Sequence, residues 1–414
     1  AKAAQGMASI AEVNEDDTES QKTILGETLE SISSLRPLAD LHTAFLMTPG
    51  ISEDNYKEIF EYLANGNSPK HTNPDLQKIL DSVVAHRDWH HFYHWPLEFP
   101  DVFGPNTSGG FSVTVGNPPW DKLKPNSKEF FSSYDANFRT YKKPKANRVA
   151  KELMDNHPSI AKRWQEHKET LDKQNKYFKQ PATYEYLGNG DIDTFKLFLE
   201  RSYQLLAANS SMGLVIPGSL TANEGCAPLR KLLLLENSMQ FLYSFENRRP
   251  TIFPAVDGRK KIIVMGMKKG SKTKSLNCAF MQHAPERLWR IDTNCLQLNL
   301  SEIERFSPSD FSIMEFRNSR EIEIAESIYS NRPRLGDKDP EAWNVALRRE
   351  LDMTNDSQLF KSEKTPFPLY EGKCVWHFDS EFAPPSRWIS YEEASSYKKL
   401  KKSLWEIDCF RVGY

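Results

Sequence analysis

The chain has 414 residues, of which 39% are hydrophobic, 27% charged and 12% aromatic. At about 150 residues per domain, this length predicts roughly two to three domains, and the composition excludes collagen-like, low-complexity and disordered chains. There are 54 Lys and Arg residues and 56 Asp and Glu residues, a net charge of −2, so any nucleic-acid binding has to rest on a local basic patch.

Shorter patterns exclude further classes of protein. The longest apolar stretches, Leu232 to Leu235 and Ile262 to Met267, fall far short of the roughly 18 residues that a membrane span needs. The first thirty residues are acidic and contain no apolar block, so no secretory signal is expected. The five cysteines are odd in number and form no CxxC pair, which favours a reducing cytoplasm over a disulfide framework or a zinc ribbon.

The first 85 residues are expected to be mainly helical. Leu25, Leu29 and Ile32 recur at helical spacing. A second helix is predicted to begin after Ser52 and to end at Asn65-Gly66, where glycine permits a left-handed terminus.

The periodicity changes at Phe111. Phe111, Val113 and Val115 alternate with polar residues, which predicts a strand that stops at the following prolines. The elements expected next are a helix over 191–206, a strand over 212–216, a helix over 228–235, and strands over 239–245 and 261–267. This alternation is typical of an open α/β sheet with helices on its faces, so we expect an α/β core over 86–270 that contains an insert over 121–190. After Gly270 the periodicity is irregular.

The insert carries the basic patch of the sequence. Between Arg139 and Lys179 there are twelve Lys or Arg residues and five Asp or Glu residues, with aromatic side chains among them. One interpretation is a solvated helical surface, which is what most charge runs are. The other is a surface for the phosphates of double-stranded DNA, because clustered flexible cations position a duplex without reading its bases. The residues predicted to make these contacts are Lys142, Lys143, Lys145, Arg148, Lys162 and Arg163.

The motif Asn117-Pro118-Pro119-Trp120 stands at the carboxyl end of the predicted strand, where open α/β sheets place their ligand sites. The side-chain oxygen of Asn117 and the carbonyl of Pro118 are two acceptors on a backbone that the prolines restrict. They would draw an exocyclic amine towards tetrahedral geometry and localise its lone pair for attack on a sulfonium methyl. Trp120 offers a face for a base rotated out of a duplex. The alternative is a rigid turn with a surface tryptophan.

A longer series of motifs stands in the same order as in a known family. The series is Phe92 to Phe103, Gly110-Phe111, Val115 to Trp120, Asp193 to Glu200, Met212 to Pro217, Leu229-Arg230, Phe245 to Asn247 and Ile252 to Pro254. It resembles the gamma-class adenine-specific DNA methyltransferases of type IIG restriction-modification enzymes and of related phage-defence systems such as BREX and DISARM. The resemblance covers roughly residues 30–270 and continues more loosely through 352–354 and 368–373.

The resemblance implies the catalytic half of a Rossmann-like, doubly wound class I methyltransferase sheet over 86–270. Residues 1–85 would be a helical part of that domain, and 271–414 a linker and the beginning of a target-recognition region. Asn117, Pro118, Pro119 and Trp120 would form the catalytic turn, and Phe253 would be the second aromatic contact of the extruded adenine or, alternatively, a core residue. Asp193 is expected to cap the helix after the turn. Double-stranded DNA would be the partner, and other subunits of a defence complex are further candidates.

The family binds S-adenosyl-L-methionine through a glycine-rich turn before the catalytic turn and an acidic residue after the next strand. Neither is found in this sequence. The run Leu187-Gly188-Asn189-Gly190-Asp191 follows the catalytic turn and lacks a preceding hydrophobic strand, so we interpret it as a loop. We therefore expect the chain to be a piece of a methyltransferase whose cofactor motif lies elsewhere.

Other interpretations of the sequence remain open. A protein or RNA methyltransferase could use the same turn, and a DNA-binding subunit could keep the fold without catalysis. His86, His90 and His94 have i, i+4 spacing, but no carboxylate or cysteine completes a metal site, so no metal is expected. Glu371-Gly372-Lys373 has the spacing of a nuclease centre, but no upstream Pro-Asp partner accompanies it, and a turn is favoured.

Overall fold

The computed structural model of the chain describes residues 17–48, 50–67, 73–104, 107–248, 252–254, 256–283, 286, 295–338, 340–345, 351–353, 356–365, 367–379 and 381–396. Cys409 and Thr354, which belong to patterns noted above, lie outside these residues. The chain divides into two compact units, residues 1–330 and 331–414.

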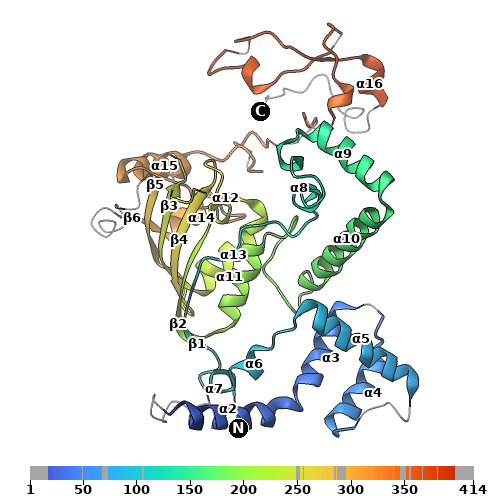
Figure 1. The fold of residues 1–414 in the computed structure, drawn as a ribbon. Coiled ribbons are helices and arrows are strands. Elements are labelled where there is room, and N and C mark those ends of the chain that lie inside the picture. The colour runs from blue at the N-terminus through green and yellow to red at the C-terminus, as the bar shows by residue number, and fades with distance from the viewer. Residues whose placement is uncertain are drawn as a thin grey trace. The chain divides into compact units, whose positions relative to one another are not determined.

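The first unit begins with helices, as the sequence predicts. They are α2 (Thr18–Ser33), α3 (Arg36–Met47), α4 (Glu53–Ala64), α5 (Pro74–His90), α6 (Trp95–Glu98) and α7 (Pro100–Phe103) (Figure 1). The Ser52 hydroxyl accepts a hydrogen bond from the Asn55 amide at 3.2 Å and starts α4, and the Asn73 side chain caps α5 ahead of Pro74. Helices α3, α4 and α5 share a core of buried aliphatic residues that includes Leu41, Ile59 and Val83.

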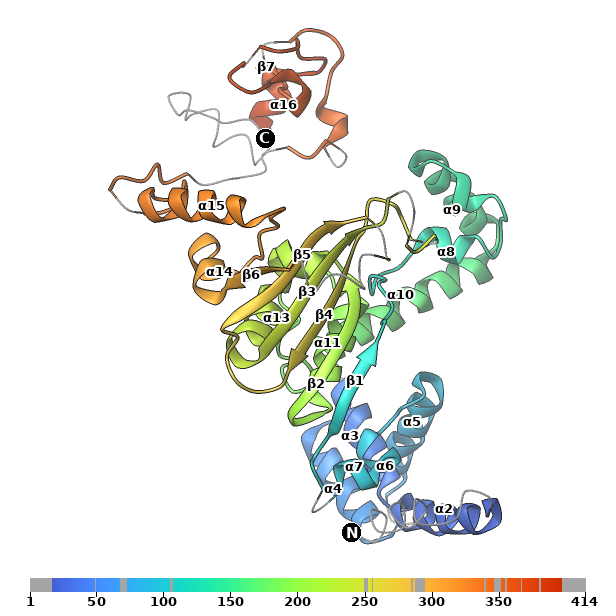
Figure 2. The same ribbon diagram turned by 90° about the vertical axis from the view of Figure 1, so that its left-hand side faces the viewer.

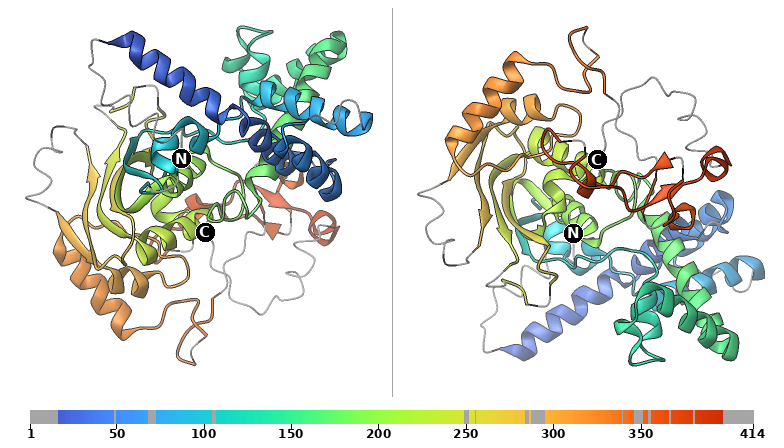
Figure 3. Two further views of the ribbon diagram at one scale, coloured as in Figure 1. Left: turned by 90° about the horizontal axis from the view of Figure 1, so that it is seen from below. Right: turned by 90° about the horizontal axis from the view of Figure 1, so that it is seen from above.

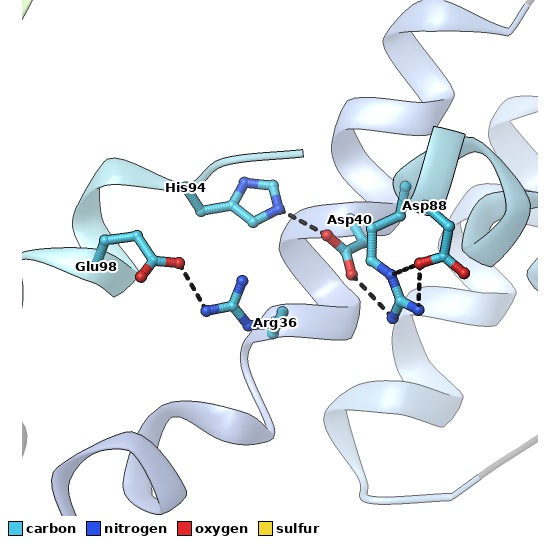
Figure 4. Close-up of polar contacts among 6 residues, drawn as sticks. Arg36, Asp40, Asp88, His94 and Glu98 are labelled. Carbon is cyan, nitrogen blue, oxygen red and sulfur yellow. Dashed lines mark hydrogen bonds and ion pairs between the residues drawn. The ribbon is translucent and has the colours of Figure 1, made fainter. Parts of the chain in front are cut away.

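A buried carboxylate ties α3 to the short helices that follow α5 (Figure 4). The His94 Nε2 donates to Asp40 Oδ1 at 2.7 Å, and the Arg87 guanidinium lies 3.8 Å from Asp40 Oδ2. Arg36 on the same helix donates to Glu98 at 2.7 Å. The Asp40 side chain is almost completely buried and out of reach of water. The hydrogen bond from His94 and the ion pair with Arg87 therefore replace the hydrogen bonds that water would make to an exposed carboxylate.

The sheet of the first unit is mixed. Its strands are β1 (Phe111–Gly116), β2 (Leu206–Pro217), β3 (Ser238–Glu246), β4 (Lys261–Lys268), β5 (Ser275–Gln282) and β6 (Leu296–Asn299), in the order β1-β2-β4-β3-β5-β6 (Figure 2). The β1–β2 and β3–β5 pairs are parallel, whereas β4 is antiparallel to both β2 and β3, and β6 is antiparallel to β5. Strands β1, β2, β3 and β5 therefore run in one direction and β4 and β6 in the other.

The four strands expected from the sequence all form within an α/β core, as predicted, but the sheet differs from a doubly wound one in two respects. Strand β4 returns antiparallel from β3 and inserts between β2 and β3, because the connection of residues 247–260 forms no helix in its described residues and a parallel crossover normally requires one. In addition, the helices that pack on the sheet in the described part of the chain cover one of its faces (Figure 3).

Three of those helices come from the connections between the strands, and the last two follow β6. They are α11 (Thr194–Gln204), α12 (Ser219–Ala222), α13 (Ala227–Lys231), which continues as a π-helix over Leu232–Glu236, α14 (Leu300–Phe306) and α15 (Ser319–Asn331). Together with the strands they enclose the main core, which includes Leu199, Ile216 and Met265. On the opposite face, the side chains of Val113 and Val115 are 58% and 79% exposed.

The basic insert between β1 and α11 has a helical core of its own. It contains α8 (Ser127–Phe131), the 3-10 turn Phe138–Thr140, α9 (Lys143–Asn156) and α10 (Pro158–Phe178). Phe131 and Phe138 are fully buried against Trp164 and the small residues of α9. The Gln180 side chain donates to the Leu46 carbonyl at 2.6 Å, which links the end of the insert to α3.

The second unit is small. It contains β7 (Phe367–Pro368) paired antiparallel with β8 (Trp388–Ile389), 3-10 turns over Ser357–Leu359 and Gly372–Cys374, and α16 (Tyr391–Ser396). Ile389 is buried against a few partly exposed apolar residues. The nuclease-like run noted above is a turn, in which Lys373 forms an ion pair with Glu371 at 2.9 Å. Among the helices described, none has the length and apolarity required to span a membrane.

We predict that Asp40→Ala lowers the free energy of unfolding by about 1.5–3 kcal/mol, because it removes the acceptor of a buried charge-assisted hydrogen bond. The matched control is Asp88→Ala, since Asp88 also pairs with Arg87, at 2.8 Å, but is 63% exposed; its cost should be no more than about 1 kcal/mol. Urea denaturation followed by circular dichroism measures both. Equal costs for the two variants would contradict the prediction.

Candidate active site

The structure places Asn117 to Trp120 directly after β1, at the carboxyl edge that β1 shares with β2 and β3 (Figure 2). Pro118 is buried, whereas Asn117 and Pro119 are exposed and Trp120 is half-buried. Within the described residues, neither the Asn117 side chain nor the Pro118 carbonyl has a hydrogen-bond partner. Both acceptors are therefore available to a ligand.

The start of α11 holds this turn in place. The Thr194 hydroxyl lies 2.7 Å from the Pro119 carbonyl oxygen and 3.0 Å from that of Asp121, and the Thr194 amide donates to Asp121 at 2.8 Å. The Leu123 amide donates to the Ile192 carbonyl at 2.8 Å and continues the contact. The backbone of the turn is thus fastened to a helix whose other residues are anchored in the core.

Asp193 does not have the role expected for it. It occupies the N-cap position of α11, but its side chain makes no capping hydrogen bond. Its backbone pairs with that of Lys122 in an isolated antiparallel β-bridge. Asp193 is therefore held by backbone pairing with the segment that follows Trp120. The residue that bonds the turn is Thr194, the next in the chain, which the sequence did not single out. The only signal for it was a hydroxyl side chain at the start of a predicted helix.

Trp120 and Phe253 lie in contact, although 132 residues separate them in the sequence. Their ring centroids are 6.1 Å apart and the ring planes meet at 87°, an edge-to-face pair. Both rings pack beside Phe245 and Ile262 at the end of the sheet. The sequence left Phe253 between two interpretations, a base contact and a core residue, and the structure places it against Trp120 while keeping it half-buried.

The indole N–H of Trp120 is buried and has no hydrogen-bond partner among the described residues. A buried donor without an acceptor costs about 1–3 kcal/mol. Its acceptor has to come from water, a ligand or a part of the chain outside those residues.

A second residue missed by the sequence analysis is Asn247, at the end of β3. Its side chain is 0% exposed and bonds to the backbone of the segment that carries Phe253. An asparagine directly after a strand is a weak signal, because such residues more often lie in open turns.

The charges next to the turn are partly neutralised. The Asp191 carboxylate accepts hydrogen bonds from Lys124 at 3.0 Å and Lys122 at 3.1 Å, and these bonds lower the pKa of Asp191. Asp191 therefore stays ionised at neutral pH and offsets much of the positive charge that the two exposed lysines would bring.

A cofactor of the S-adenosyl-L-methionine type needs a glycine-rich turn that the cofactor can approach closely. The glycine run over 187–191 is a loop, as expected from the sequence. Gly188 has a φ of +69° and lies so close to the Gly225 carbonyl that a Cβ there would be 2.6 Å from its oxygen. The backbone at Gly188 is therefore packed against Gly225 and leaves no room at that position for an adenosine.

The predicted DNA-contacting residues are all exposed and belong to α9, its N-terminus and α10 (Figure 1). Arg148 and Lys162 each lie within 4 Å of a glutamate one helical turn further on, at 3.7 and 3.9 Å. The Arg163 guanidinium lies 3.5 Å from the Tyr134 hydroxyl, and the Lys145 ammonium lies 4.0 Å from the centre of the Tyr141 ring. These four residues are thus locally satisfied in part.

Lys142 and Lys143 differ from the other four because no ion pair involves them within the described residues. They stand at the N-terminus of α9, and its first turn contains no acidic residue. Positive charge at a helix N-terminus is electrostatically unfavourable. This end of the insert therefore has the strongest uncompensated positive charge of the predicted set.

The three histidines considered as metal ligands separate in the structure. His86 and His90 stack at a centroid distance of 5.9 Å, whereas His94 faces Asp40. His86, His90, Trp89 and Lys173 line an open cavity of about 350 Å³ between α5 and α10. Burial, with a smaller contribution from the charge of Lys173, lowers the pKa of His86. Within the described residues, no three His, Cys, Asp or Glu side chains are grouped as a metal site would require.

Residues 164–253 match the family model of the Eco57I restriction-modification methylase. The matched segment runs from within α10 to Phe253 and covers well under half of the chain, and it does not include Asn117. It does contain α11 and Thr194, β2, β3 and Asn247. A search of curated protein sequences finds no match.

Comparison with solved structures gives similarities of low TM-score. The modification subunit of a putative type I restriction enzyme from Vibrio vulnificus YJ016 has a TM-score of 0.31 at 10% identity, over 52% of this chain and 40% of that one. The type IIG restriction endonuclease BpuSI has a TM-score of 0.27 at 15% identity, over 66% and 31%. A chain of a type I restriction-modification complex has a TM-score of 0.29 at 12% identity, over 75% and 71%. The chain thus spans less than half the length of the first two.

Proposed function

We propose that this chain carries the base-binding side of a DNA methyltransferase that modifies the exocyclic amine of adenine, in a restriction-modification or phage-defence system. The observation that carries the proposal is the joint position of two acceptors and two aromatic rings. Asn117 and Pro118 offer acceptors at the carboxyl edge of the sheet that no described residue occupies, and Trp120 of the same turn meets Phe253 at 87°. The methylase family match over residues 164–253 supports it independently.

The turn suits an aromatic amine because such a nitrogen delocalises its lone pair into the ring. The Asn117 oxygen and the Pro118 carbonyl would each accept one N–H of the amine, which draws the nitrogen towards tetrahedral geometry. The backbone that carries both acceptors is restricted by the prolines and by the hydrogen bond from Thr194 to the Pro119 carbonyl. Trp120 and Phe253 form two walls at right angles, so a base lying flat on one ring meets the edge of the other.

S-adenosyl-L-methionine is the methyl donor that the resemblance implies. The glycine run over 187–191 offers it no cradle at Gly188, which is packed against the backbone at Gly225. The proposal therefore assigns to this chain the acceptor side of the reaction, namely binding the base, excluding water from its face and orienting its amine.

DNA is favoured over a protein substrate by the exposed basic face of the insert, which lies between the catalytic turn and α11 in the sequence. A protein methyltransferase using the same turn would have no need for it. A non-catalytic DNA-binding subunit would use the basic face but would leave Asn117 and the aromatic pair without a role.

We predict that Asn117→Ala in the full-length protein lowers the rate of adenine methylation by on the order of a hundred- to a thousandfold, because one of two preorganised acceptors is removed. Asn117 is exposed and unpartnered, so the melting temperature and DNA affinity should stay close to those of the unaltered protein. Mass spectrometry of nucleosides from treated DNA measures the product. Methylated cytosine as the product, or near-full activity of the variant, would refute the assignment.

We predict that replacing Lys142, Lys143 and Lys145 together by Gln weakens binding to specific and random duplexes alike. The slope of log affinity against log salt should become shallower by up to about 0.9 for each phosphate that is no longer neutralised. A matched control replaces Lys57, Lys78 and Arg320 by Gln; each lies outside the insert, is exposed and is paired with an acidic residue of its own helix, at 3.9, 2.9 and 2.8 Å. The control has the same change in net charge and should leave the slope unchanged. An equal effect of the two triple substitutions would mean that the basic face of the insert is a solvated surface that does not contact DNA.

We predict that the 414-residue chain by itself binds S-adenosyl-L-methionine weakly or not at all. The first half of a doubly wound sheet normally supplies the glycine-rich turn and the ribose-binding carboxylate, and neither occurs in this sequence. Isothermal titration calorimetry measures the affinity. A dissociation constant in the low micromolar range would show that the chain contains a cofactor-binding motif of another form.

A further inference from the structure

The connection between β3 and β4 spans residues 247–260 and lies at the same end of the sheet as the catalytic turn (Figure 2). Its ends are adjacent, because Glu246 pairs with Lys261 in the antiparallel ladder. The described residues of this connection form neither helix nor strand. Three backbone hydrogen bonds among these residues, donated by the amides of Asn247, Val256 and Lys260, set part of its path, and the rest depends on hydrogen bonds from side chains.

One buried side chain makes most of these bonds. The Asn247 Oδ1 accepts the backbone N–H of Ile252 at 3.0 Å and of Phe253 at 2.9 Å. Its Nδ2 donates to the carbonyl of Phe253 at 3.0 Å and of Val256 at 2.9 Å. A side-chain amide has two donor hydrogens and two acceptor lone pairs, so every one is used.

Phe253 is the residue most tightly held by this arrangement. Asn247 bonds both its backbone N–H and its backbone carbonyl, which leaves the orientation of the peptide unit little freedom. The Phe253 ring then meets the edge of Trp120. Breaking the Asn247 bonds would release the one segment that brings a second aromatic ring to the catalytic turn.

We infer that Asn247 is the positioning residue that sets Phe253 against Trp120 and so completes the binding site for the extruded base. The inference rests on the proposed function for its role in base binding, but the contact between Asn247 and the loop stands independently of it. Asn247 acts through Phe253 and does not itself touch the base.

The chemistry of the clamp requires an amide. In Asn247→Asp, which has almost the same shape, the carboxylate would still accept from the Ile252 and Phe253 amides. It would also face the carbonyl oxygens of Phe253 and Val256 without a hydrogen to donate. The substitution therefore reverses two of the four bonds while keeping the volume of the side chain.

Asn237 offers a matched control at the other end of the same strand. It is also 0% exposed, its Nδ2 donates to the Leu232 carbonyl at 2.9 Å, and its Oδ1 accepts from the Gly270 amide at 3.0 Å. Asn237→Asp therefore places an equal buried charge beside β3, far from Phe253 along the strand. Any effect common to both variants is a general loss of stability.

The first measurement is amide hydrogen exchange of the full chain by mass spectrometry. We expect Asn247→Asp to accelerate exchange in peptides covering residues 252–256 by on the order of tenfold or more, since two of the bonds that close this segment are broken. Asn237→Asp should leave those peptides unchanged and accelerate exchange near Gly270. Unchanged exchange over 252–256 in Asn247→Asp would overturn the inference.

The second measurement is the kinetics of DNA methylation by the full-length protein. Asn247→Asp should lower kcat by on the order of tenfold while changing KM for DNA by less than about twofold, because phosphate contacts are untouched. Asn237→Asp, at equal folded fraction, should change neither. A loop that exchanges faster with an unchanged kcat would overturn the role of Asn247 in the site.

A third variant keeps the inference testable if Asn247→Asp folds poorly. Phe253→Leu removes the ring and leaves the clamp, so it should reproduce the loss of kcat with normal exchange over the loop. The two hypotheses also fail separately. If the unaltered protein methylates no DNA, the proposed function is wrong, whereas selective acceleration of loop exchange in Asn247→Asp would still support the positioning of Phe253.

Discussion

The parallel pairing of β1 with β2 is the constraint on which the rest of the site depends. The pairing aligns Gly116 with Leu214 and leaves the turn Asn117-Pro118-Pro119-Trp120 at the carboxyl edge of the sheet. The chain then has to travel from the end of β1 back to the beginning of β2, and both the basic insert and α11 lie in this connection. Because α11 begins beside the turn, Thr194 can fasten the turn's carbonyl groups to the core helix.

The antiparallel strand β4 has a different consequence. By entering the sheet between β2 and β3, it converts the end of β3 into a hairpin connection that rises above the same edge. A helical crossover at this place would have directed the chain onto a face of the sheet. The hairpin instead keeps residues 252–254 near the Asn117–Trp120 turn, where Asn247 bonds Phe253 and the Phe253 ring contacts Trp120. The site thus combines a turn restricted locally by prolines with a loop restricted by one buried amide.

The basic side chains beside the turn and in the insert differ in how far neighbouring carboxylates neutralise them. Asp191 offsets Lys122 and Lys124 beside the turn, and glutamates offset Arg148 and Lys162 along their helices. The N-terminus of α9 lacks such compensation, since its first turn is basic and contains no acid. Exposed ion pairs contribute little stability, so the pattern matters for where an anionic partner would be attracted.

Features that depend on neighbouring residues could be predicted from the amino-acid order alone. The alternation from Phe111 to Val115, the prolines at 118 and 119 and the cap at Ser52 predict the strand, the turn and the helix that the structure contains, because φ restriction and capping act over a few residues. The assembled fold was needed for the mixed order of the sheet, the use of Thr194 in place of Asp193, the pairing of His94 with Asp40, and the meeting of Phe253 with Trp120. Each of these joins residues far apart or chooses among several equally suitable polar groups, and burial against the assembled core makes that choice.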